Sequence, residues 1–238
     1  MSTNLPPLAE PLDAPEPNGP QPIEPATPQM RLQMLSTEHW SLLASRNLAW
    51  NEAFTRSGMF LSTLSFTVVA LALVGQASGF GQEFRLFALV TLPVVLFLGI
   101  STIIRLDSAN NHDMTCVIGM NRIRAAYLEL APDLDRYFVM GTTDDFAGIE
   151  TTMANLTGRP FFSHIVAAAP FQITVMNSIV LGTIAALVAI QLGASSAVAL
   201  GAAAVGFLAM VAGFFLYTRR LLATLMRTYK PAFPARED

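Results

Sequence analysis

The stretch GMFLSTLSFTVVALALVGQ, residues 58–76, decides the fold class, because it contains no charged residue and no histidine. A helix needs roughly 20 apolar residues to cross the hydrocarbon core of a bilayer. Three further stretches are of similar length and equally free of charge: residues 86–104, 171–191 and 197–217. We therefore predict an all-α membrane protein with four transmembrane helices in two hairpins and cytoplasmic helical extensions.

The overall composition agrees with a membrane protein. Hydrophobic residues make up 53% of the chain and charged residues only 13%, whereas a soluble domain typically carries ~25% charged residues. The basic residues form no cluster of the kind that binds nucleic acid. The lipid bilayer is the expected partner, and nucleic acid is not.

The distribution of basic residues predicts the orientation of the chain. Of the 14 Lys and Arg residues, only Arg85 lies beside the connection between the first two apolar stretches; all others lie on the opposite side. Lys and Arg in short flanking segments are retained in the cytoplasm. Both termini and the long middle segment should therefore be cytoplasmic, in a protein of the plasma (inner) membrane.

Prolines and acidic residues set the first segment apart. Nine of the 15 prolines lie within residues 1–28, and no basic residue precedes Arg31, a composition that favours disorder. The chain divides into a disordered acidic tail (1–29), an amphipathic cytoplasmic or interfacial helix (30–57), a transmembrane hairpin (58–104), a cytoplasmic region with an interfacial segment (105–170), a second hairpin (171–217) and a cytoplasmic tail (218–238).

Local signals place the helix ends. Thr27 and Pro28 are typical of an N-cap followed by proline in the first turn, and the absence of Gly and Pro from residues 30–56 predicts one helix of about 70 Å running into the first span. Pro132 should end a helix over residues 105–130. Residues 131–160 are predicted to be irregular loops, and residues 159–166 a short interfacial helix ended by Pro170.

Motifs for catalysis are absent. The sequence contains no GxSxG, HExxH or Walker motif, and we expect neither an enzyme nor a cofactor. His112 and Cys116 are four residues apart near Asp107 and Asp113, but zinc needs three or four ligands in a tighter pattern, so no metal site is expected. Acidic residues in the middle segment are predicted to be solvated, with the inner mouth of a cation pathway as the alternative; they are Asp133, Asp135, Asp144, Asp145 and Glu150.

Polar and small residues within the apolar stretches are the candidate functional positions. Ser62, Ser65 and Asn177 must face protein or water at membrane depth, and so either line a pore or bond between helices. Small residues at four-residue spacing allow close helix packing; the candidates are Gly182, Ala186, Ala202, Gly206, Ala209 and Gly213.

Three functions remain open. An oligomeric channel or pore-forming effector is favoured by uncharged spans with polar faces. A non-conducting scaffold or sensor would recruit a cytoplasmic partner through the N-terminal tail or helices. A transporter is disfavoured, because the spans lack the charges that couple transport to ions. Since one four-helix subunit encloses little space, a channel implies a homo-oligomer.

Overall fold

The computed structural model describes residues 25–153 and 168–235, and within these ranges the chain forms helices and no strand. Four of the helices are long: α1 (Pro28–Ser78), α2 (Gln82–Leu130), α5 (Ala169–Gln191) and α6 (Ser196–Thr228). Two short elements lie between α2 and α5, the 3₁₀ helix η1 (Pro132–Tyr137) and helix α3 (Phe146–Met153).

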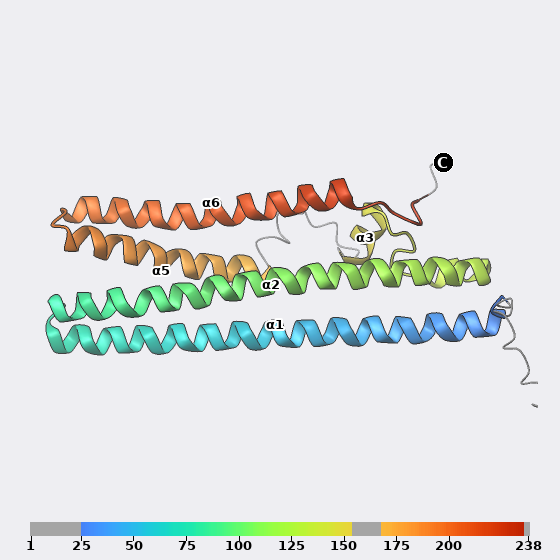
Figure 1. Ribbon diagram of the computed structural model, residues 1–238, viewed down its shortest axis with the longest axis horizontal. Helices are drawn as coiled ribbons and strands as arrows, with labels where there is room; N and C mark the ends of the chain where they lie inside the picture. The colour runs from blue at the N-terminus through green and yellow to red at the C-terminus, as the bar shows by residue number, and fades with distance from the viewer. Residues whose placement is uncertain (1–24, 154–167, 236–238) are drawn as a thin grey trace, which may run out of the picture.

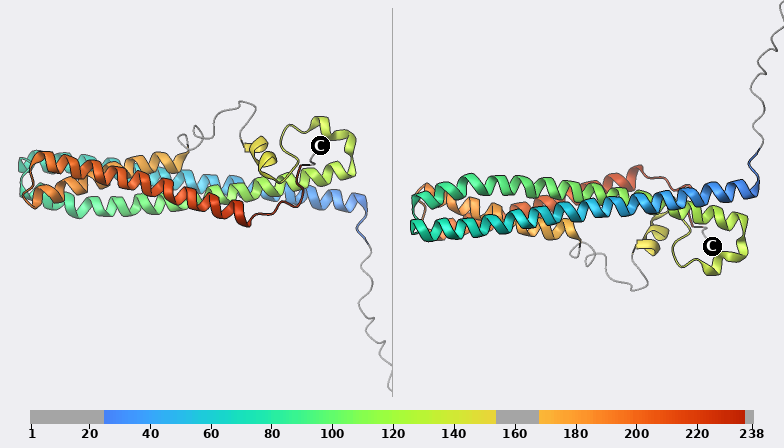
Figure 2. Two further views of the ribbon diagram at one scale, coloured as in Figure 1. Left: turned by 90° about the horizontal axis from the view of Figure 1, so that it is seen from above. Right: turned by 90° about the horizontal axis from the view of Figure 1, so that it is seen from below.

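The long helices lie side by side in the order α1, α2, α5, α6 (Figure 1). Residues 79–81 join α1 to α2, and Gly79 ends α1 in the left-handed conformation at φ 59°, which glycine adopts without strain. Residues 192–195 join α5 to α6 at the same end of the molecule. Figure 2 shows that η1 and α3 lie to one side of the long helices, near the opposite end.

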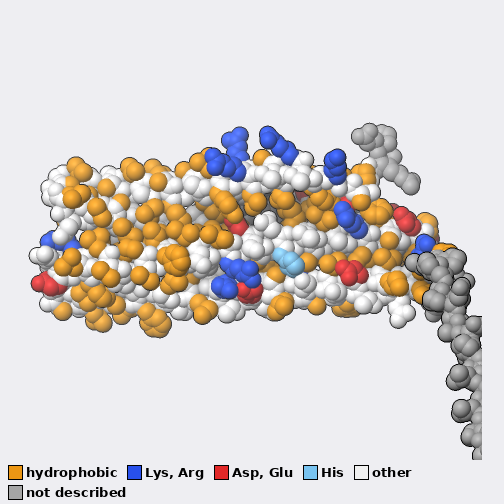
Figure 3. Space-filling model, viewed as in Figure 1, with side chains coloured by type: hydrophobic (Ala, Val, Ile, Leu, Met, Phe, Trp, Pro, Cys, Tyr) orange, Lys and Arg blue, Asp and Glu red, His pale blue; other side chains and the backbone are white. Residues whose placement is uncertain are grey.

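All four long helices are long and apolar enough to cross a membrane. Their outward faces carry large apolar side chains: Phe66 is 74% exposed and Leu200 73% exposed. In Figure 3 the visible face is free of charged side chains between the tip near the two turns and the middle of the molecule. An apolar band of this size is suited to lipid, and it indicates a membrane protein, as the sequence predicts.

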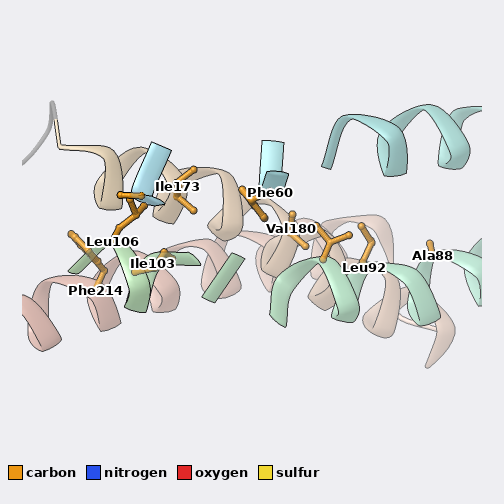
Figure 4. Close-up of a cluster of buried hydrophobic side chains, with 10 residues drawn as sticks. Phe60, Ala88, Leu92, Ile103, Leu106, Ile173, Val180 and Phe214 are labelled. Carbon is orange, nitrogen blue, oxygen red and sulfur yellow. The ribbon is translucent and has the colours of Figure 1, made fainter. Parts of the chain in front are cut away.

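The interior between the helices is apolar. Figure 4 shows side chains from all four long helices meeting there, among them Phe60 of α1, Leu92 of α2, Val180 of α5 and Phe214 of α6. Each of these is at least nine-tenths buried. The two pairs of helices therefore share one apolar core.

The sections of α1 and α2 beyond their apolar spans, residues 28–57 and 105–130, run together and are called the stem here. The Thr27 hydroxyl accepts a hydrogen bond from the Met30 amide (3.2 Å), and Pro28 occupies the first turn. The predicted N-cap is thus confirmed, as is the single helix through the first span. The stem extends α1 by about 45 Å at the rise of an α-helix.

Two predictions for the middle segment are wrong. Residues 131–160 are not wholly irregular, because they contain η1 and α3. The Asp145 carboxylate caps α3 by accepting a hydrogen bond from the Gly148 amide (2.9 Å), a short-range signal that the Gly and Thr around it obscured. Pro170 does not end a helix; it lies in the first turn of α5, where a missing amide costs nothing.

Two further predictions lie outside the described residues. Of the predicted disordered tail, residues 1–24 are not described, and residues 25–27 precede α1 without regular structure. The predicted interfacial helix over residues 159–166 is also not described.

Candidate functional site

One face of α1 carries an uncharged row of exposed residues along almost its whole length. The buried residues Ala53, Phe60 and Thr67 recur every seven positions and face the other helices. On the opposite face, exposed residues follow one another at alternating spacings of three and four positions. This spacing keeps them on one side of the helix. This row is called the α1 seam, and it consists of Met34, Thr37, Ser41, Ala44, Leu48, Asn51, Thr55, Gly58, Ser62, Ser65, Val69, Ala72 and Gln76.

Ser62 and Ser65 both lie on the α1 seam, at the level of the first apolar span. The Ser65 hydroxyl donates a hydrogen bond to the Leu61 carbonyl oxygen within the helix (2.8 Å). Its proton is thereby satisfied, while the oxygen can still accept from water or a neighbouring helix. Bulkier exposed residues flank the seam on both sides, and they include Leu61, Phe66, Val68 and Leu73.

Asn177 lies elsewhere, inside the bundle between α5 and α2. It is fully buried, and its Nδ2 donates a hydrogen bond to the Leu96 carbonyl oxygen of α2 (3.2 Å). Its Oδ1 has no hydrogen-bond partner among the described residues. Gly99 makes room for the amide, because a Cβ there would overlap it. The structure therefore brings Ser62 and Ser65 to one exposed surface of α1 and buries Asn177 between α5 and α2.

The small residues of α5 and α6 fall into three groups. Gly182 and Gly206 lie where the two helices touch: a Cβ on Gly182 would come within 2.7 Å of the Ala203 carbonyl oxygen, and one on Gly206 within 3.2 Å of the Gly182 Cα. Ala186 and Ala202 are half-buried. Ala209 and Gly213 are exposed, and they line a groove of about 410 Å³ with Ile103, Thr174 and Phe214.

Buried charge holds the two helices of the stem together. The Asp113 carboxylate of α2, whose side chain is 3% exposed, pairs with Arg46 of α1 and accepts a hydrogen bond from Trp50 Nε1 (2.9 Å). Arg46 also donates from its second terminal nitrogen to Asp113 Oδ2 (3.2 Å). A buried carboxylate is tolerated only with such a complete set of donors.

His112 and Cys116 touch, although no third ligand among the described residues joins them. Their Nε2 and Sγ atoms are 3.6 Å apart, and the Ser45 hydroxyl is 2.8 Å from the same nitrogen. Burial raises the pKa of the Cys116 thiol, which disfavours the thiolate that binds metals. Among residues 25–153 and 168–235, no group of three or more potential metal ligands comes together.

Asp107 is a buried carboxyl three residues past the second apolar span. Its Oδ2 has no hydrogen-bond partner within the described part of the chain. Burial raises the pKa of Asp107 to about 6. This carboxyl group can therefore take up a proton close to neutral pH.

Asp144 fastens the segment after α6 to α2, contrary to the prediction that it is solvated. Its side chain is 0% exposed. The carboxylate accepts hydrogen bonds from Arg122 Nε (2.8 Å), the Tyr229 hydroxyl (3.0 Å), and the backbone amides of Ala232 (2.9 Å) and Phe233 (2.7 Å). We call this arrangement the Asp144 clasp. Sequence reasoning missed it because the donors lie far from Asp144 along the chain.

A second buried polar residue completes the end of the stem. Asn121 is fully buried, donates to the Thr143 carbonyl oxygen (2.8 Å) and accepts from Arg124 (2.7 Å) and from the Thr152 hydroxyl (2.9 Å). It ties α2 to the loop before α3 and to α3 itself. No sequence pattern marked Asn121, since a single Asn in a polar helix is ordinarily exposed.

No protein-family model, no curated protein and no solved structure matches this chain.

Proposed function

We propose that the chain forms a homo-oligomeric channel in a membrane, with the α1 seam lining the conducting path between subunits. In this arrangement the two helix pairs are transmembrane hairpins, and the stem, both termini and the Asp144 clasp are cytoplasmic. The stems then surround the inner mouth of the path. The observation that carries the proposal is the exposed, uncharged α1 seam with Ser62 and Ser65 at membrane depth.

The interior of a single subunit supports a path between subunits. Its core is filled by apolar side chains from all four long helices, and the Asn177 amide is bonded to the α2 backbone. Buried apolar packing of this kind excludes water. Water and ions would therefore have to pass along a surface that the subunit presents outward.

The α1 seam has the side chains that such a surface requires. Small and hydroxyl-bearing residues leave space and offer oxygen atoms to water or cations, while the bulkier flanking residues can pack against a neighbouring subunit. The seam continues from the apolar span into the stem without a charged residue. A path along it would be weakly selective, because no ring of fixed charge would line it.

Thiol accessibility during conduction tests this proposal. The purified protein with Cys116→Ser is reconstituted in planar bilayers, and Ser62→Cys and Ser65→Cys are added singly. A charged thiol reagent should reduce the current in both variants. Val68→Cys is the matched control, since Val68 is also exposed on the same helix but lies off the seam. Absence of current in the parent, or equal block in all three variants, would contradict an α1-lined path.

The proposed sidedness has its own test. Ser78→Cys and Ser195→Cys, in the Cys116→Ser background, should react with an impermeant reagent added to intact cells, and Thr115→Cys should react only after lysis. Thr115 is exposed, whereas the natural Cys116 is 1% exposed and would resist labelling on either side. Labelling of Thr115→Cys from outside would reverse the orientation.

One observation favours the alternative of a non-conducting scaffold. Trp40, in the stem and off the α1 seam, is 70% exposed. Exposed Trp residues are enriched where proteins bind one another. If the reconstituted protein is an intact oligomer that passes no current, recruitment of a partner through the stem becomes the better function.

A further inference from the structure

A cavity of about 260 Å³ lies between α1 and α2 where the apolar spans end and the stem begins. Pockets for drug-sized ligands typically measure ~300–1,000 Å³, so this one suits a smaller group. Polar side chains line it from both helices, and they include Ser45, Glu52, Arg105, Ser108 and His112.

Small side chains create this cavity. Ala49 and Ala53 of α1 face Ser108 and Ala109 of α2 across it, and none of these side chains is long enough to fill the space. Two hydroxyl groups, of Ser45 and Ser108, therefore line a space that also contains a guanidinium and an imidazole. Hydroxyl and guanidinium groups are typical donors to phosphate oxygens.

The Glu52 carboxylate, which lines the cavity, is paired with two arginines. Glu52 accepts hydrogen bonds from Arg105 at 3.0 and 2.7 Å and from Arg56 at 3.0 Å. The hydrogen bond from Arg105 lowers the pKa of Glu52, and the same bond raises the pKa of Arg105, so this pair is charged at neutral pH. Two arginines thus share one carboxylate, and of the two Arg105 lines the cavity.

Arg105 can bind a further anion without leaving Glu52. A guanidinium has five N–H donors, and the two hydrogen bonds to Glu52 engage its Nε and one terminal nitrogen. Arg56 pairs with the same carboxylate and would keep Glu52 neutralised. The remaining N–H donors of Arg105 are thus available to phosphate oxygens.

The depth of the cavity matches that of lipid headgroups. Arg105 directly follows the apolar stretch 86–104, and Arg56 lies just before the stretch 58–76. His112 is about 10 Å further along α2 at the rise of an α-helix. The headgroup layer of a bilayer is roughly 5–8 Å thick on each side, so the cavity spans this layer.

We propose that this cavity binds the phosphate-bearing headgroup of an anionic phospholipid, with Arg105 as the principal ligand and Ser108 as a second donor. The acyl chains would lie along the apolar spans above it. Basic sites at the membrane interface between transmembrane helices suit anionic headgroups. The proposal goes beyond the channel and does not depend on it, because binding is measured on the purified chain whether or not it conducts.

Lipid-dependent thermal stability tests the site. The full chain in dodecyl maltoside is titrated with dioleoyl phosphatidylglycerol, dioleoyl phosphatidylcholine or inorganic phosphate, and its melting temperature is followed. Phosphatidylglycerol should raise the melting temperature more than phosphatidylcholine or phosphate does. Arg105→Gln should raise the half-saturating concentration of phosphatidylglycerol about tenfold or more, as expected when a charged hydrogen bond is lost.

Two further variants keep the test decisive. Ser108→Leu should fill the cavity and weaken the response to phosphatidylglycerol without any change in charge. Arg220→Gln is the matched control. Arg220 is exposed just past the apolar stretch 197–217, so this substitution removes the same charge at a similar depth. It should leave the response to phosphatidylglycerol unchanged. Equal losses in Arg105→Gln and Arg220→Gln, with a normal response in Ser108→Leu, would overturn the site. Equal stabilisation by inorganic phosphate would overturn its assignment to a lipid.

Discussion

The apolar half of the molecule and the stem are held together by opposite means. In the apolar half, α5 and α6 approach through Gly182 and Gly206, and one buried amide, that of Asn177, bonds α5 to α2. In the stem and at its end, the buried carboxylates Asp113 and Asp144 gather arginine, tryptophan, tyrosine and backbone donors. The same chain thus joins helices by close approach at one end and by charge at the other.

The difference follows from the two solvents. Lipid tails are as apolar as the side chains, so helices in a membrane associate through close packing and a few hydrogen bonds rather than through the hydrophobic effect. In water a carboxylate leaves solvent only when donors replace its hydration. Loss of a buried carboxylate, in the stem or at its end, should therefore lower the free energy of unfolding by more than loss of an amide between the membrane helices.

The largest effect is expected from Asp144→Ala. This change leaves the Ala232 and Phe233 amides without their acceptor and removes the partner of Arg122, whereas the Tyr229 hydroxyl keeps the Asp144 backbone carbonyl oxygen (2.7 Å). We expect a loss of about 3 kcal/mol, the lower end of the range for a broken buried ion pair, because Arg122 can return to water. Hydrogen exchange of the backbone amides of residues 229–235 and thermal unfolding in detergent measure it.

Asp135→Ala is the control for Asp144→Ala. Asp135 is an exposed acidic residue of η1 in the same region, and its removal should change stability by less than ~0.5 kcal/mol. Similar effects of both substitutions would show that the Asp144 clasp contributes nothing specific.

Acid should open the Asp144 clasp. Burial by itself would raise the pKa of Asp144, but the Ala232 and Phe233 amides and Arg122 hold it below its usual value. A carboxyl whose folded pKa is depressed contributes stability above its unfolded pKa, and this contribution is lost as the pH falls through the folded pKa. Exchange protection of the Ala232 and Phe233 amides, whose hydrogen bonds the Asp144 carboxylate accepts, should therefore be constant above pH ~5 and decline below about pH 4. Asp144→Asn should remove this pH dependence; a decline that persists in Asp144→Asn would assign it to another group.

An intermediate effect is expected at the contact between α5 and α6. Gly206→Leu forces a side chain against the Gly182 Cα and the Leu181 carbonyl oxygen, both 3.2 Å from the position of a Cβ. Because backbone atoms cannot move aside, the helices must separate, at a cost of about 1–3 kcal/mol. Thermal unfolding in detergent should show a lower melting temperature.

Gly213→Leu is the matched control on the same helix. Among the described residues, no atom other than those of the adjoining α6 backbone lies within 4 Å of the position of a Cβ at Gly213, so a single subunit should accept leucine without loss of stability. If Gly213→Leu is as destabilising as Gly206→Leu, or if it dissociates the proposed oligomer on size-exclusion chromatography, a further helix covers this face of α6.

The smallest loss of stability among the buried polar positions is expected from Asn177→Leu. The hydrogen bond to the Leu96 carbonyl oxygen is lost, and hydrogen bonds between membrane helices average about 0.6 kcal/mol. Because Asn177 lies inside the folded chain, the current expected of the proposed channel should retain its selectivity in this variant. A change of selectivity with unchanged melting temperature would instead place this amide on the conducting path.

The sequence predicted the elements better than their contacts. The four apolar spans, the Thr27 N-cap and the end of α2 before Pro132 all depend on residues within a few positions of one another, and the structure has them. Helix α3 was missed although its Asp145 cap is also local, because eight residues in a Gly- and Thr-rich segment give a weak pattern. The position of Pro170 was correctly noticed and wrongly interpreted, since proline is compatible with either end of a helix.

For the candidate site as well, some features follow from local sequence and others from packing. The sequence identified Ser62 and Ser65 as polar at membrane depth, and their shared face follows from helical spacing alone. That this face points away from α2 depends on which side of α1 the core covers. No spacing rule connects the positions that are hydrogen-bonded at the end of the stem, where Asp144 pairs with Arg122 and Tyr229.

By itself, the sequence determined that this chain has four helices able to cross a membrane, because the length and apolarity of each span are properties of consecutive residues. It also determined where the long helix α1 begins. Only the tertiary structure decided that Asp144 is buried, that Asn177 faces α2 and that Gly206, unlike Gly213, lies at a helix contact. These depend on which faces meet across the bundle, and burial and hydrogen bonding are energies of pairs of groups brought together by packing, which local sequence does not specify.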